Sequence, residues 1–543
     1  MANAFSDIRE PKNEPPYSYP PGSIERTKLK AELERLANTV IEIPAIINGK
    51  EVKTNNTMDV MMPHKHQHKL ATLHLCGEKE VELAIKSSVE ASKKWAKLPW
   101  EQRVAVFEKA ADLISGPYHY TLNAASMLGQ SKNPYESEID AIAEIIDFFR
   151  FNVYYLTQIY KGQPYSPDGM WNRTEYRPLE GFVFAVTPFN FTSIGANLPT
   201  APVICGNVTL WKPATSAVYS NYILMTILKE AGLPDGVINF LPGKGASIGD
   251  PVLKSKYLAG LHFTGSTKTF HHLWKQIGSN IESYNTYPRV VGETGGKDFI
   301  FAHPSANVRA LAVGALRGAF GYQGQKCSAA SRAYIPKSIW PEFKHIFTQE
   351  VAKIKVGDIQ NFENYMGAVI DQSAFDKISG YIDYAQASND AEIIIGGQYD
   401  DSIGYFIQPT LIKAENPGFK TMEEEIFGPV LTVYVFEDDH FEETLELCNA
   451  TSPYGLTGSI FSQDRYAINF MVDYLTQAAG NFYINDKPTA AVVNQQPFGG
   501  ARKSGTNDKA GSASNLMRWL SNRSIKETTV PPQDWIRPFM EKE

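Results

Sequence analysis

The sequence predicts an α/β protein with two domains, each built on a parallel sheet. Short apolar runs alternate with amphipathic helical segments from residue 181 to 278 and again from 306 to 486. Such runs are typical of strands buried on both faces, and helices between them produce βαβ units. The length of 543 residues also exceeds what one ordinary hydrophobic core accommodates. Two consecutive α/β domains satisfy both observations.

The N-terminal region is expected to be an extended arm followed by helices. Prolines at positions 11, 15, 16, 20 and 21 favour an extended chain over residues 1–25. We interpret the aromatic stripe of the segment near residue 149 as core rather than as a cofactor site. Helical periodicity predicts helices over 24–36, 80–95, 101–114 and 136–156.

The two α/β series follow. In the first, strands are expected at 181–187, 207–212, 237–241 and 261–264, with helices at 216–231 and 267–278. In the second, strands are expected at 333–335, 431–436, 458–461 and 481–484. Residues 522–535 are predicted to form one more strand and an irregular tail that does not fold alone.

Composition excludes several classes of function. The formal net charge of −7 offers no basic surface to nucleic acid, and no apolar run is long enough for a transmembrane helix. The four cysteines are scattered without CxxC spacing, which indicates a reducing intracellular compartment. His271 and His272, with His262 nearby, are interpreted as surface residues, so no metal site is expected. The acidic N-terminus matches neither a transit peptide nor a secretory signal.

Cys327 is the first candidate for catalysis. It stands among glycines and polar residues directly after Lys326, a setting that favours an accessible thiol with a lowered pKa. The other interpretation is a small cysteine packed in the core. Glu293, in Gly-Glu-Thr-Gly-Gly-Lys at 292–297, places a carboxylate upstream in the chain. The pattern therefore predicts a covalent nucleophile.

Two strand-to-helix turns could bind a nucleotide. The glycine-rich segment 243–249 follows a strand, but its third glycine is one residue too late for GxGxxG. A dinucleotide loop and a plain turn both remain open for it. The segment Phe-Thr-Gly-Ser at 263–266 also precedes a helix, whose free N–H groups could hold a pyrophosphate. Lys212 at a strand end could reach a ribose or phosphate, or could be a solvated strand end.

Seven motifs occur together in one order, and with them the chain resembles the aldehyde dehydrogenase superfamily over roughly residues 45–530. That family binds NAD without a GxGxxG loop, which accounts for the failed fingerprint. The motifs are Pro-Phe-Asn-Phe at 188–191, Trp-Lys-Pro-Ala at 211–214, Phe-Thr-Gly-Ser at 263–266, Gly-Glu-Thr-Gly-Gly-Lys at 292–297, Gly-Gln-Lys-Cys at 324–327, Glu-Ile-Phe-Gly-Pro at 425–429 and Pro-Phe-Gly-Gly at 497–500.

Within this superfamily the chain resembles the subgroup that oxidises L-glutamate γ-semialdehyde to L-glutamate. This aldehyde forms by hydrolysis of Δ1-pyrroline-5-carboxylate, in the second step of proline degradation. The resemblance rests on segments 139–152, 320–329 and 495–508. Two alternatives stay open: an aldehyde dehydrogenase for another semialdehyde, and a catalytically silent scaffold or binding protein on this fold.

The resemblance implies three catalytic roles. Cys327 would attack the aldehyde carbon, and the resulting thiohemiacetal can release hydride to NAD. The side-chain amide of Asn190 and the backbone N–H of Cys327 would stabilise the oxyanion. Glu293 would act as general base for hydrolysis of the thioester. The alternative interpretations are a turn residue for Asn190 and a turn cap for Glu293. Retention of all three residues argues against the silent scaffold.

The resemblance also implies binding residues for NAD and for the substrate. Ala490 departs from the glycine common in relatives, which could restrict the backbone there. The implied cofactor residues are Lys212 and Glu425 at the ribose hydroxyls, Thr187 on the nicotinamide side, and Gly265, Ser266, Thr267, Lys268 and Thr269 near the pyrophosphate. The implied substrate residues are Ser328, Ala490 and Ala491 at the carboxylate, with Phe191 and Phe498 along the aliphatic chain.

The domain organisation is inferred in the same way. The resemblance implies a Rossmann-type NAD domain, an α/β catalytic domain and a β-hairpin arm that makes at least a homodimer. The arm is expected from 160–178 with the strand near 524–530. The family's pathway implies the mitochondrial matrix, with the cytoplasm as the alternative. The expected segments are 1–44 (arm and first helix), 45–158 and 180–292 (NAD domain), 293–486 (catalytic domain), 159–179 and 515–543 (oligomerisation arm and tail), and 487–514 (active-site loop).

Overall fold

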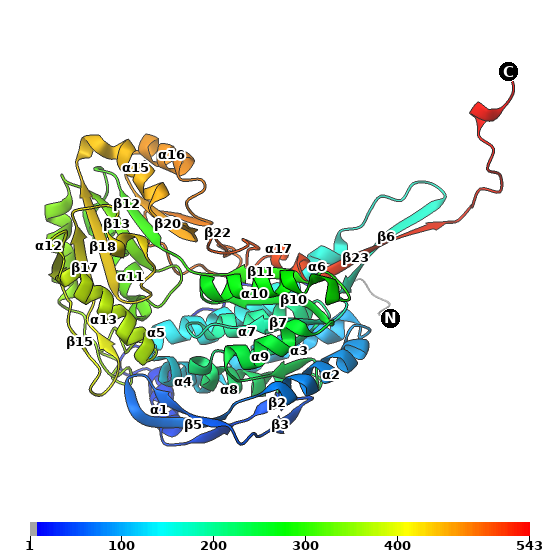
Figure 1. The fold of residues 1–543 in the computed structure, drawn as a ribbon, viewed down its shortest axis with the longest axis horizontal. Helices are drawn as coiled ribbons and strands as arrows, with labels where there is room; N and C mark the ends of the chain where they lie inside the picture. Colours follow the sequence, from blue (N-terminus) through cyan, green and yellow to red (C-terminus); the bar gives the residue numbers. More distant parts are fainter. Residues whose placement is uncertain (1–7) are drawn as a thin grey trace.

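A computed structural model describes residues 8–543, so the start of the expected 1–44 arm lies outside the described residues. Two large bodies, each built on its own sheet, lie side by side, and a narrow ribbon projects from one of them (Figure 1). The expected α/β class with two parallel sheets is confirmed. The N-terminal segment is extended until α1 begins at Ile24, as its prolines predict.

The first sheet has seven strands in the order β11-β10-β7-β8-β9-β2-β3. Its five strands from β11 to β9 pair in parallel, while β2 and β3 extend the sheet antiparallel. The four strands expected in the first series are present, each within a few residues of its predicted bounds. The strands are β2 (Ala45–Ile47), β3 (Lys50–Val52), β7 (Phe182–Val186), β8 (Val208–Lys212), β9 (Ile238–Phe240), β10 (Leu258–Thr264) and β11 (Arg289–Glu293).

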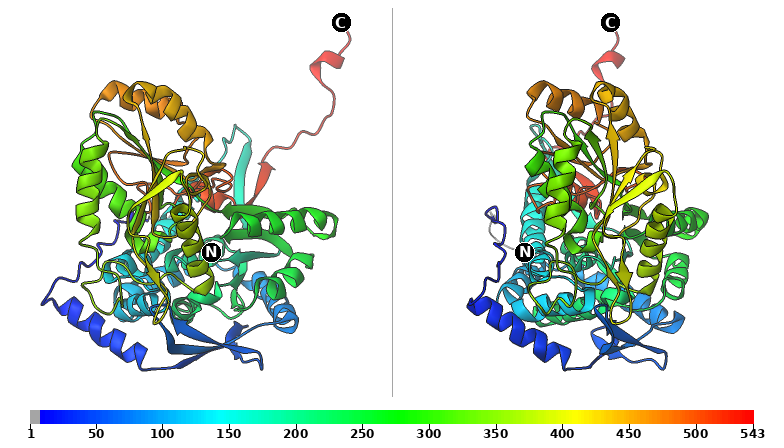
Figure 2. Two further views of the ribbon diagram at one scale, coloured as in Figure 1. Left: turned by 60° about the vertical axis from the view of Figure 1, so that its left-hand side comes forward. Right: turned by 90° about the vertical axis from the view of Figure 1, so that its left-hand side faces the viewer.

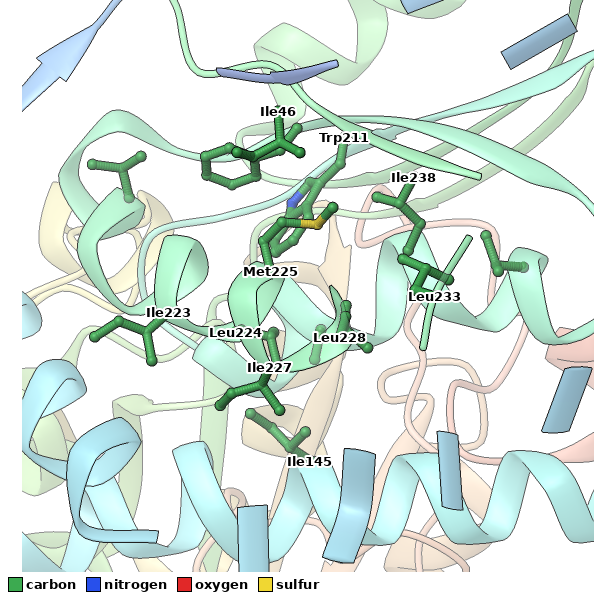
Figure 3. Packing of buried hydrophobic residues seen from close by; sticks show 14 of the residues in the cluster. Ile46, Ile145, Trp211, Ile223, Leu224, Met225, Ile227, Leu228, Leu233 and Ile238 are labelled. Atoms are coloured by element: carbon green, nitrogen blue, oxygen red, sulfur yellow. The ribbon is translucent and has the colours of Figure 1, made fainter. Parts of the chain in front are cut away.

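Helices pack on this sheet through a continuous apolar core. Figure 3 shows Met225 of α8 (Val218–Glu230) beside Trp211 of β8, while Ile227 of the same helix points toward Ile145 of α6 (Ile145–Lys161). The α8 helix therefore fills the space between the sheet and the neighbouring helix layer. The helices of this body include α1 (Ile24–Ala37), α2 (Glu78–Trp95), α3 (Trp100–Ser115), α4 (His119–Gln130), α7 (Thr192–Ile204), α8 (Val218–Glu230), α9 (Gly245–Lys254), α10 (Thr267–Ser279) and α17 (Ala513–Met517).

The second sheet has seven strands in the order β14-β17-β18-β13-β12-β20-β21, and only β14 is antiparallel. The four strands expected in the second series are all present. The strands are β12 (Asp298–Ala302), β13 (Ala330–Pro336), β14 (Ala391–Ile395), β17 (Thr410–Ala414), β18 (Val430–Phe436), β20 (Thr457–Phe461) and β21 (Asn481–Ile484). The helices around it include α11 (Val308–Phe320), α12 (Trp340–Val351), α13 (Gln372–Gln386), α14 (Lys420–Glu423), α15 (Phe441–Ala450) and α16 (Arg465–Tyr474).

Some strands were not expected from the sequence. A small sheet in the order β1-β5-β4 packs under the first body. The longest of its strands begins Lys-His-Gln-His-Lys and therefore lacks a clean apolar alternation. The short pairs β15–β16 and β19–β22 have only two residues in each strand, too few to show an alternation. The strands without a sequence prediction are β1 (Ile41–Ile43), β4 (Thr57–Met62), β5 (Lys65–His74), β15 (Tyr399–Asp400), β16 (Phe406–Ile407), β19 (Tyr454–Gly455) and β22 (Ala501–Arg502), together with β2, β3, β11, β12, β14 and β17 of the two large sheets.

The helix expected over 136–156 is three consecutive pieces. A short α5 (Pro134–Ser137) leads into a π-helical turn, Glu138–Glu144, and then into α6 (Ile145–Lys161). Periodicity indicates a helix but does not distinguish the wider π turn from the α form. Such turns occur mostly inside α-helices and often at functional sites.

The projecting arm is a two-stranded ribbon. Strand β6 (Met170–Pro178) pairs antiparallel with β23 (Leu520–Thr528), from Met170 opposite Thr528 to Pro178 opposite Leu520. The ribbon thus combines the two segments expected to form the arm, 160–178 and the strand near 524–530, which lie far apart in the sequence. The views in Figures 1 and 2 show the ribbon and the C-terminal tail standing away from both bodies.

Candidate active site

A cavity of about 910 Å³ lies where the two bodies meet. Its wall combines Thr264 and Glu293 from the first sheet with Cys327 and Ser328, which precede β13 of the second sheet. The chain folds so that the upstream carboxylate and the candidate nucleophile share one space. All the expected substrate residues also line it: Phe191, Ser328, Ala490, Ala491 and Phe498.

Cys327 is held by an unusual turn that follows α11. Tyr322 and Gln323 both have left-handed backbones, with φ of 51° and 55°, and both are buried. The Gln323 side-chain nitrogen donates to the carbonyls of Ser131 at 2.9 Å and of Ala368 at 2.8 Å. Left-handed residues other than glycine cost free energy, so such a turn persists only where surrounding contacts fix it. Those contacts hold Cys327 at the cavity wall.

The expected lowering of the Cys327 pKa is wrong for the protein without ligands. Burial raises the pKa of the thiol well above its usual range, and the nearby carboxylates of Asp298 and Glu293 raise it further. The neighbouring Lys326 does not compensate, because its ammonium is paired with Glu136 at 2.7 Å. The side chain is still partly exposed to the cavity, which agrees with an accessible thiol.

Two glycines bring the Glu293 turn against the catalytic loop. A Cβ at Gly296 would stand 2.1 Å from the carbonyl oxygen of Cys327, and one at Gly295 would stand 2.7 Å from Glu425 Oε1. Only glycine permits both approaches. The pKa of Glu293 is raised well above its ordinary value by burial, and its Oε2 has no hydrogen-bond partner among the described residues. A buried carboxyl with a raised pKa and one free oxygen at the cavity wall suits a general base.

Asn190 lies behind this wall. It is buried, and its Nδ2 donates to the carbonyl of Gln325 at 3.0 Å, two residues before Cys327. That bond uses one of the two N–H groups of the amide and fixes the side chain next to the catalytic turn. The segment is held in turn by Asp140 of the π turn, which accepts the N–H groups of Thr192 and Ser193, each at 2.9 Å. Asp140 thus caps α7 directly after Asn190.

The expected cofactor residues lie at the carboxyl ends of the parallel strands of the first sheet, where nucleotides bind in such folds. Lys212 ends β8 and Thr187 follows β7, while the segment 265–269 opens α10. Burial lowers the pKa of Lys212 to about 8, and none of residues 8–543 places a carboxylate within ion-pair distance of it. A buried ammonium without an anionic partner fits a ribose or phosphate ligand.

The remaining cofactor residues converge from two directions. Ser266 caps α10 by accepting from the Thr269 N–H at 3.3 Å. The cap uses one N–H group of the first turn, and the others have no acceptor within the helix. Glu425 comes from the second body, and its Oε1 accepts from the Gly296 N–H at 2.9 Å. Its carboxylate therefore lies beside the turn that also carries Glu293. These residues and the 910 Å³ cavity flank the catalytic turn from different sides, since none of the cofactor set lines the cavity.

Comparison with known proteins identifies the family. The profile described as aldehyde dehydrogenase family matches residues 51–525, a range that includes Asn190, Glu293 and Cys327. The chain belongs to the aldehyde dehydrogenase family. Delta-1-pyrroline-5-carboxylate dehydrogenase, mitochondrial, of Dictyostelium discoideum is 52% identical over 540 residues, covering 99% of this chain and 97% of that protein. The Homo sapiens protein of the same name is 46% identical over 530 residues, covering 97% of this chain and 94% of the relative.

A solved structure is similar over the whole length. The crystal structure of the Delta-pyrroline-5-carboxylate dehydrogenase from Mycobacterium tuberculosis bound with NAD superposes with a TM-score of 0.97 at 48% identity, and the match covers 100% of both chains. The arrangement of the two sheets and the ribbon is thus that of an aldehyde dehydrogenase, as the motif order implied.

Several ionisable residues of this aldehyde dehydrogenase were not expected at the site. Glu144 lines the cavity, accepts from Ser193 Oγ at 2.8 Å, and has its pKa raised by burial to about 8. Lys132 is fully buried in an ion pair with Asp140 at 2.5 Å. A signal existed in the sequence, because acidic residues recur at positions 136, 140 and 144 among the apolar residues of this helical segment. Four-residue spacing places them on one face.

Other expectations about ionisable groups also change. His262 is buried rather than at the surface, and its Nδ1 lies 2.9 Å from the carbonyl of Leu198. His271 and His272 are exposed, as expected. Within residues 8–543, no group of three potential metal ligands comes together, and no helix has the length and apolarity needed to cross a membrane.

Proposed function

We propose that this protein catalyses the NAD-dependent oxidation of L-glutamate γ-semialdehyde, formed from Δ1-pyrroline-5-carboxylate, to L-glutamate. The observation that carries the proposal is the shared cavity. Cys327 and Glu293 face it from one side, and Ser328, Ala490 and Ala491 face it at the loop expected to receive a carboxylate. The names of the relatives support the same substrate and cofactor.

The reaction starts at Cys327. Its thiol is neutral at rest because burial and neighbouring carboxylates raise its pKa. Once deprotonated, the sulfur attacks the aldehyde carbon and forms a tetrahedral thiohemiacetal. The developing oxyanion receives hydrogen bonds from the Cys327 N–H and the Asn190 amide, whose position is fixed by the Gln325 carbonyl.

NAD, when bound, supplies the hydride acceptor. Lys212 and Glu425 would hold its ribose hydroxyls, Thr187 would lie on the nicotinamide side, and the start of α10 from Gly265 to Thr269 would face the pyrophosphate. The unpaired ammonium of Lys212 and the capped helix start support this assignment. Glu293 then takes a proton from the water that hydrolyses the thioester on Cys327, which releases the carboxylic acid.

The substrate carboxylate would be bound by Ser328, which follows Cys327, and by the loop at 489–491. Ser328 is fixed by a hydrogen bond of its Oγ to Thr489 Oγ1 at 2.8 Å, and Thr489 leads directly into Ala490 and Ala491. The hydroxyl and the loop N–H groups would receive the α-carboxylate. Phe191 and Phe498 line the same cavity and would flank the aliphatic chain.

We also propose how the protein assembles and in which compartment it acts. The ribbon of β6 and β23 leaves both outer edges unpaired among the described residues, and Trp171 on it is 56% exposed. Exposed strand edges are normally covered, so we expect at least a homodimer joined through this arm. The mitochondrial names of several relatives support a matrix location.

NADH absorbance tests the proposal with two substrates, Δ1-pyrroline-5-carboxylate and succinic semialdehyde, for wild type and Cys327→Ala. Cys327-dependent turnover that prefers the pyrroline substrate supports the full assignment. An equal or reversed preference would keep the thiol chemistry and replace the substrate by another semialdehyde. Absence of NADH with either aldehyde, despite NAD binding, would indicate a silent scaffold.

A further inference from the structure

The proline-rich N-terminal segment forms part of the cavity wall. Residues 13–16 and 18–21 line the same 910 Å³ space as Cys327, although they lie more than 300 positions away in the sequence. Tyr19 of this segment is only 3% exposed. The segment is therefore built into the site instead of hanging free, and its contacts show which parts of the site it reaches.

Asn13 joins two structural elements that do not belong to the segment. Its Nδ2 donates to Asp147 Oδ2 of α6 at 2.8 Å and to the carbonyl of Val493 at 2.9 Å. Its Oδ1 accepts from Gln495 Nε2 at 3.0 Å. A single side chain thus connects the helix that borders the cavity to the loop over 489–496.

The rest of the segment anchors Asn13. The Glu14 N–H donates to the second oxygen of Asp147 at 2.8 Å, and the Glu14 carboxylate pairs with Arg150 at 2.8 Å. Farther along, the Tyr17 N–H donates to Glu138 at 3.1 Å, and the Tyr19 hydroxyl bonds the same carboxylate. The segment is fixed at both ends to carboxylates of the helical run 138–147. These bonds already restrict the backbone around Asn13, so its own hydrogen bonds cost little additional conformational entropy.

The loop that receives these bonds is the one proposed to bind the substrate carboxylate. Ala490 and Ala491 stand between two tethers: Thr489, which is bonded to Ser328, and Val493, whose carbonyl is held by Asn13. Val493 also packs on Phe148 of α6. Ala490 has a left-handed φ of 72°, a conformation that needs support in a residue other than glycine.

We propose that Asn13 is a positioning residue that sets the geometry of the 489–496 loop, and thereby selects aldehydes carrying a carboxylate. The N-terminal segment acts as a strap between α6 and this loop. The inference rests on the proposed function, since it assigns a further residue to recognition of the same substrate. Asn13 itself need not touch the substrate, and its effect passes through the N–H groups of Ala490 and Ala491.

The test compares Asn13→Ala with Asn38→Ala, an exposed asparagine whose side chain bonds only the end of α1. Steady-state kinetics are measured with glutamate γ-semialdehyde and with propanal, which lacks the carboxylate. In Asn13→Ala we expect KM for the semialdehyde to rise roughly 3- to 30-fold, as loss of one or two hydrogen bonds predicts. The kcat, the KM for NAD and the propanal kinetics should stay within about twofold of wild type, and Asn38→Ala should match wild type throughout.

A second readout does not depend on turnover. Amide hydrogen exchange of residues 489–496 should accelerate in Asn13→Ala and stay unchanged in Asn38→Ala. An unchanged KM for the semialdehyde, or an equal rise of KM for the semialdehyde and for propanal, would contradict the proposed role of Asn13. So would unaltered exchange in the loop. A wild-type protein inactive toward every aldehyde would instead contradict the proposed function, and the exchange measurement would still decide the structural role of Asn13.

Discussion

In the proposed reaction, Cys327 and Glu293 would each carry a negative charge in a cavity whose burial disfavours that charge. Burial raises the pKa of both groups, and the Glu293 carboxylate is one of the charges that raise the pKa of Cys327. The two ionisations therefore oppose each other. This arrangement suits a two-step reaction in which the thiolate and the base are needed at different times.

Glu293→Gln should separate these two steps. Without the base, thioester hydrolysis slows, so steady-state kcat should fall at least about 100-fold. The first NADH burst should survive, since thiohemiacetal formation needs only Cys327 and the oxyanion donors. Stopped-flow absorbance measures both quantities. Loss of the burst together with kcat would contradict this division of roles, and Glu446→Gln on the exposed face of α15 serves as control.

The same substitution should change stability in a pH-dependent way. The folded-state pKa of Glu293 is raised, so the folded protein binds this proton more tightly than the unfolded chain does. Ionisation therefore costs stability as pH rises above the unfolded pKa of about 4.3 through the raised folded value. Glu293→Gln should raise Tm relative to wild type at pH 8 and not at pH 4. Equal Tm differences at both pH values would contradict the raised pKa.

Ala490 permits a test of backbone strain. Its φ of 72° lies in the left-handed region, where a β-branched residue is strongly disfavoured. Ala490→Val should lower the free energy of unfolding by about 1–3 kcal/mol and raise the semialdehyde KM, while Ala490→Gly should keep both near wild type. Urea unfolding and kinetics check the pair. A valine variant as active and stable as the glycine variant would show that the loop adapts.

At the scale of elements, the π turn explains how distant parts of the site are aligned. Asp140 on this turn pairs with Lys132 after α4 and caps α7 just after Asn190 and Phe191. The Lys132 ammonium in turn lies 4.4 Å from the centroids of the Phe191 and Tyr322 rings. The Asp140 carboxylate therefore connects the segment after Asn190 to the turn before Cys327 through packed aromatic rings.

Asp140→Asn should lower the free energy of unfolding, because it leaves the buried charge of Lys132 without its carboxylate partner. Breaking a buried ion pair typically costs about 3–5 kcal/mol, and we expect a loss of that order in urea unfolding. The kcat should also fall, since the Asn190 segment loses its support. The double variant Lys132→Met/Asp140→Asn removes the orphaned charge and should recover part of the stability. If the double variant is no more stable than Asp140→Asn, the loss of stability comes from the cap on α7 and not from the ion pair.

At the scale of the whole molecule, the ribbon and the C-terminal tail stand away from the two bodies. They carry exposed apolar side chains, including Trp171 at 56%, Trp535 at 75% and Phe539 at 86%. Another copy of the chain would cover such a projecting apolar surface, so we expect the arm to join protomers.

Trp171→Glu on the ribbon should shift the protein toward the monomer. A charge on a surface that a partner buries is unfavourable, so light scattering after gel filtration should show a smaller mass at the same concentration. Tyr466→Glu, on the outer side of α16 where Tyr466 is 88% exposed, is the matched control. An unchanged mass for Trp171→Glu would show that assembly uses another surface.

Much of the fold could be predicted from the sequence because its signals are local. The strands at 182–186, 208–212 and 430–436 are apolar runs, and the helices around them have clear periodicity. The small sheet of β1, β4 and β5 escaped prediction because polar residues interrupt its pattern. The pairing of β6 with β23 joins distant parts of the chain, so no local pattern encodes it, and only the resemblance to the family predicted it.

The sequence by itself determined the family and the candidate chemistry, since ordered motifs around Asn190, Glu293 and Cys327 are a property of the chain alone. Only the tertiary structure decided the electrostatics. Lys326 precedes Cys327 in sequence, yet its ammonium pairs with Glu136. Burial and the Asp298 carboxylate therefore raise the pKa of the thiol. The contacts of Asn13 with Asp147, Val493 and Gln495 likewise depend on tertiary structure. Charge and hydrogen bonding depend on which groups fold next to each other, and adjacency in sequence does not specify that.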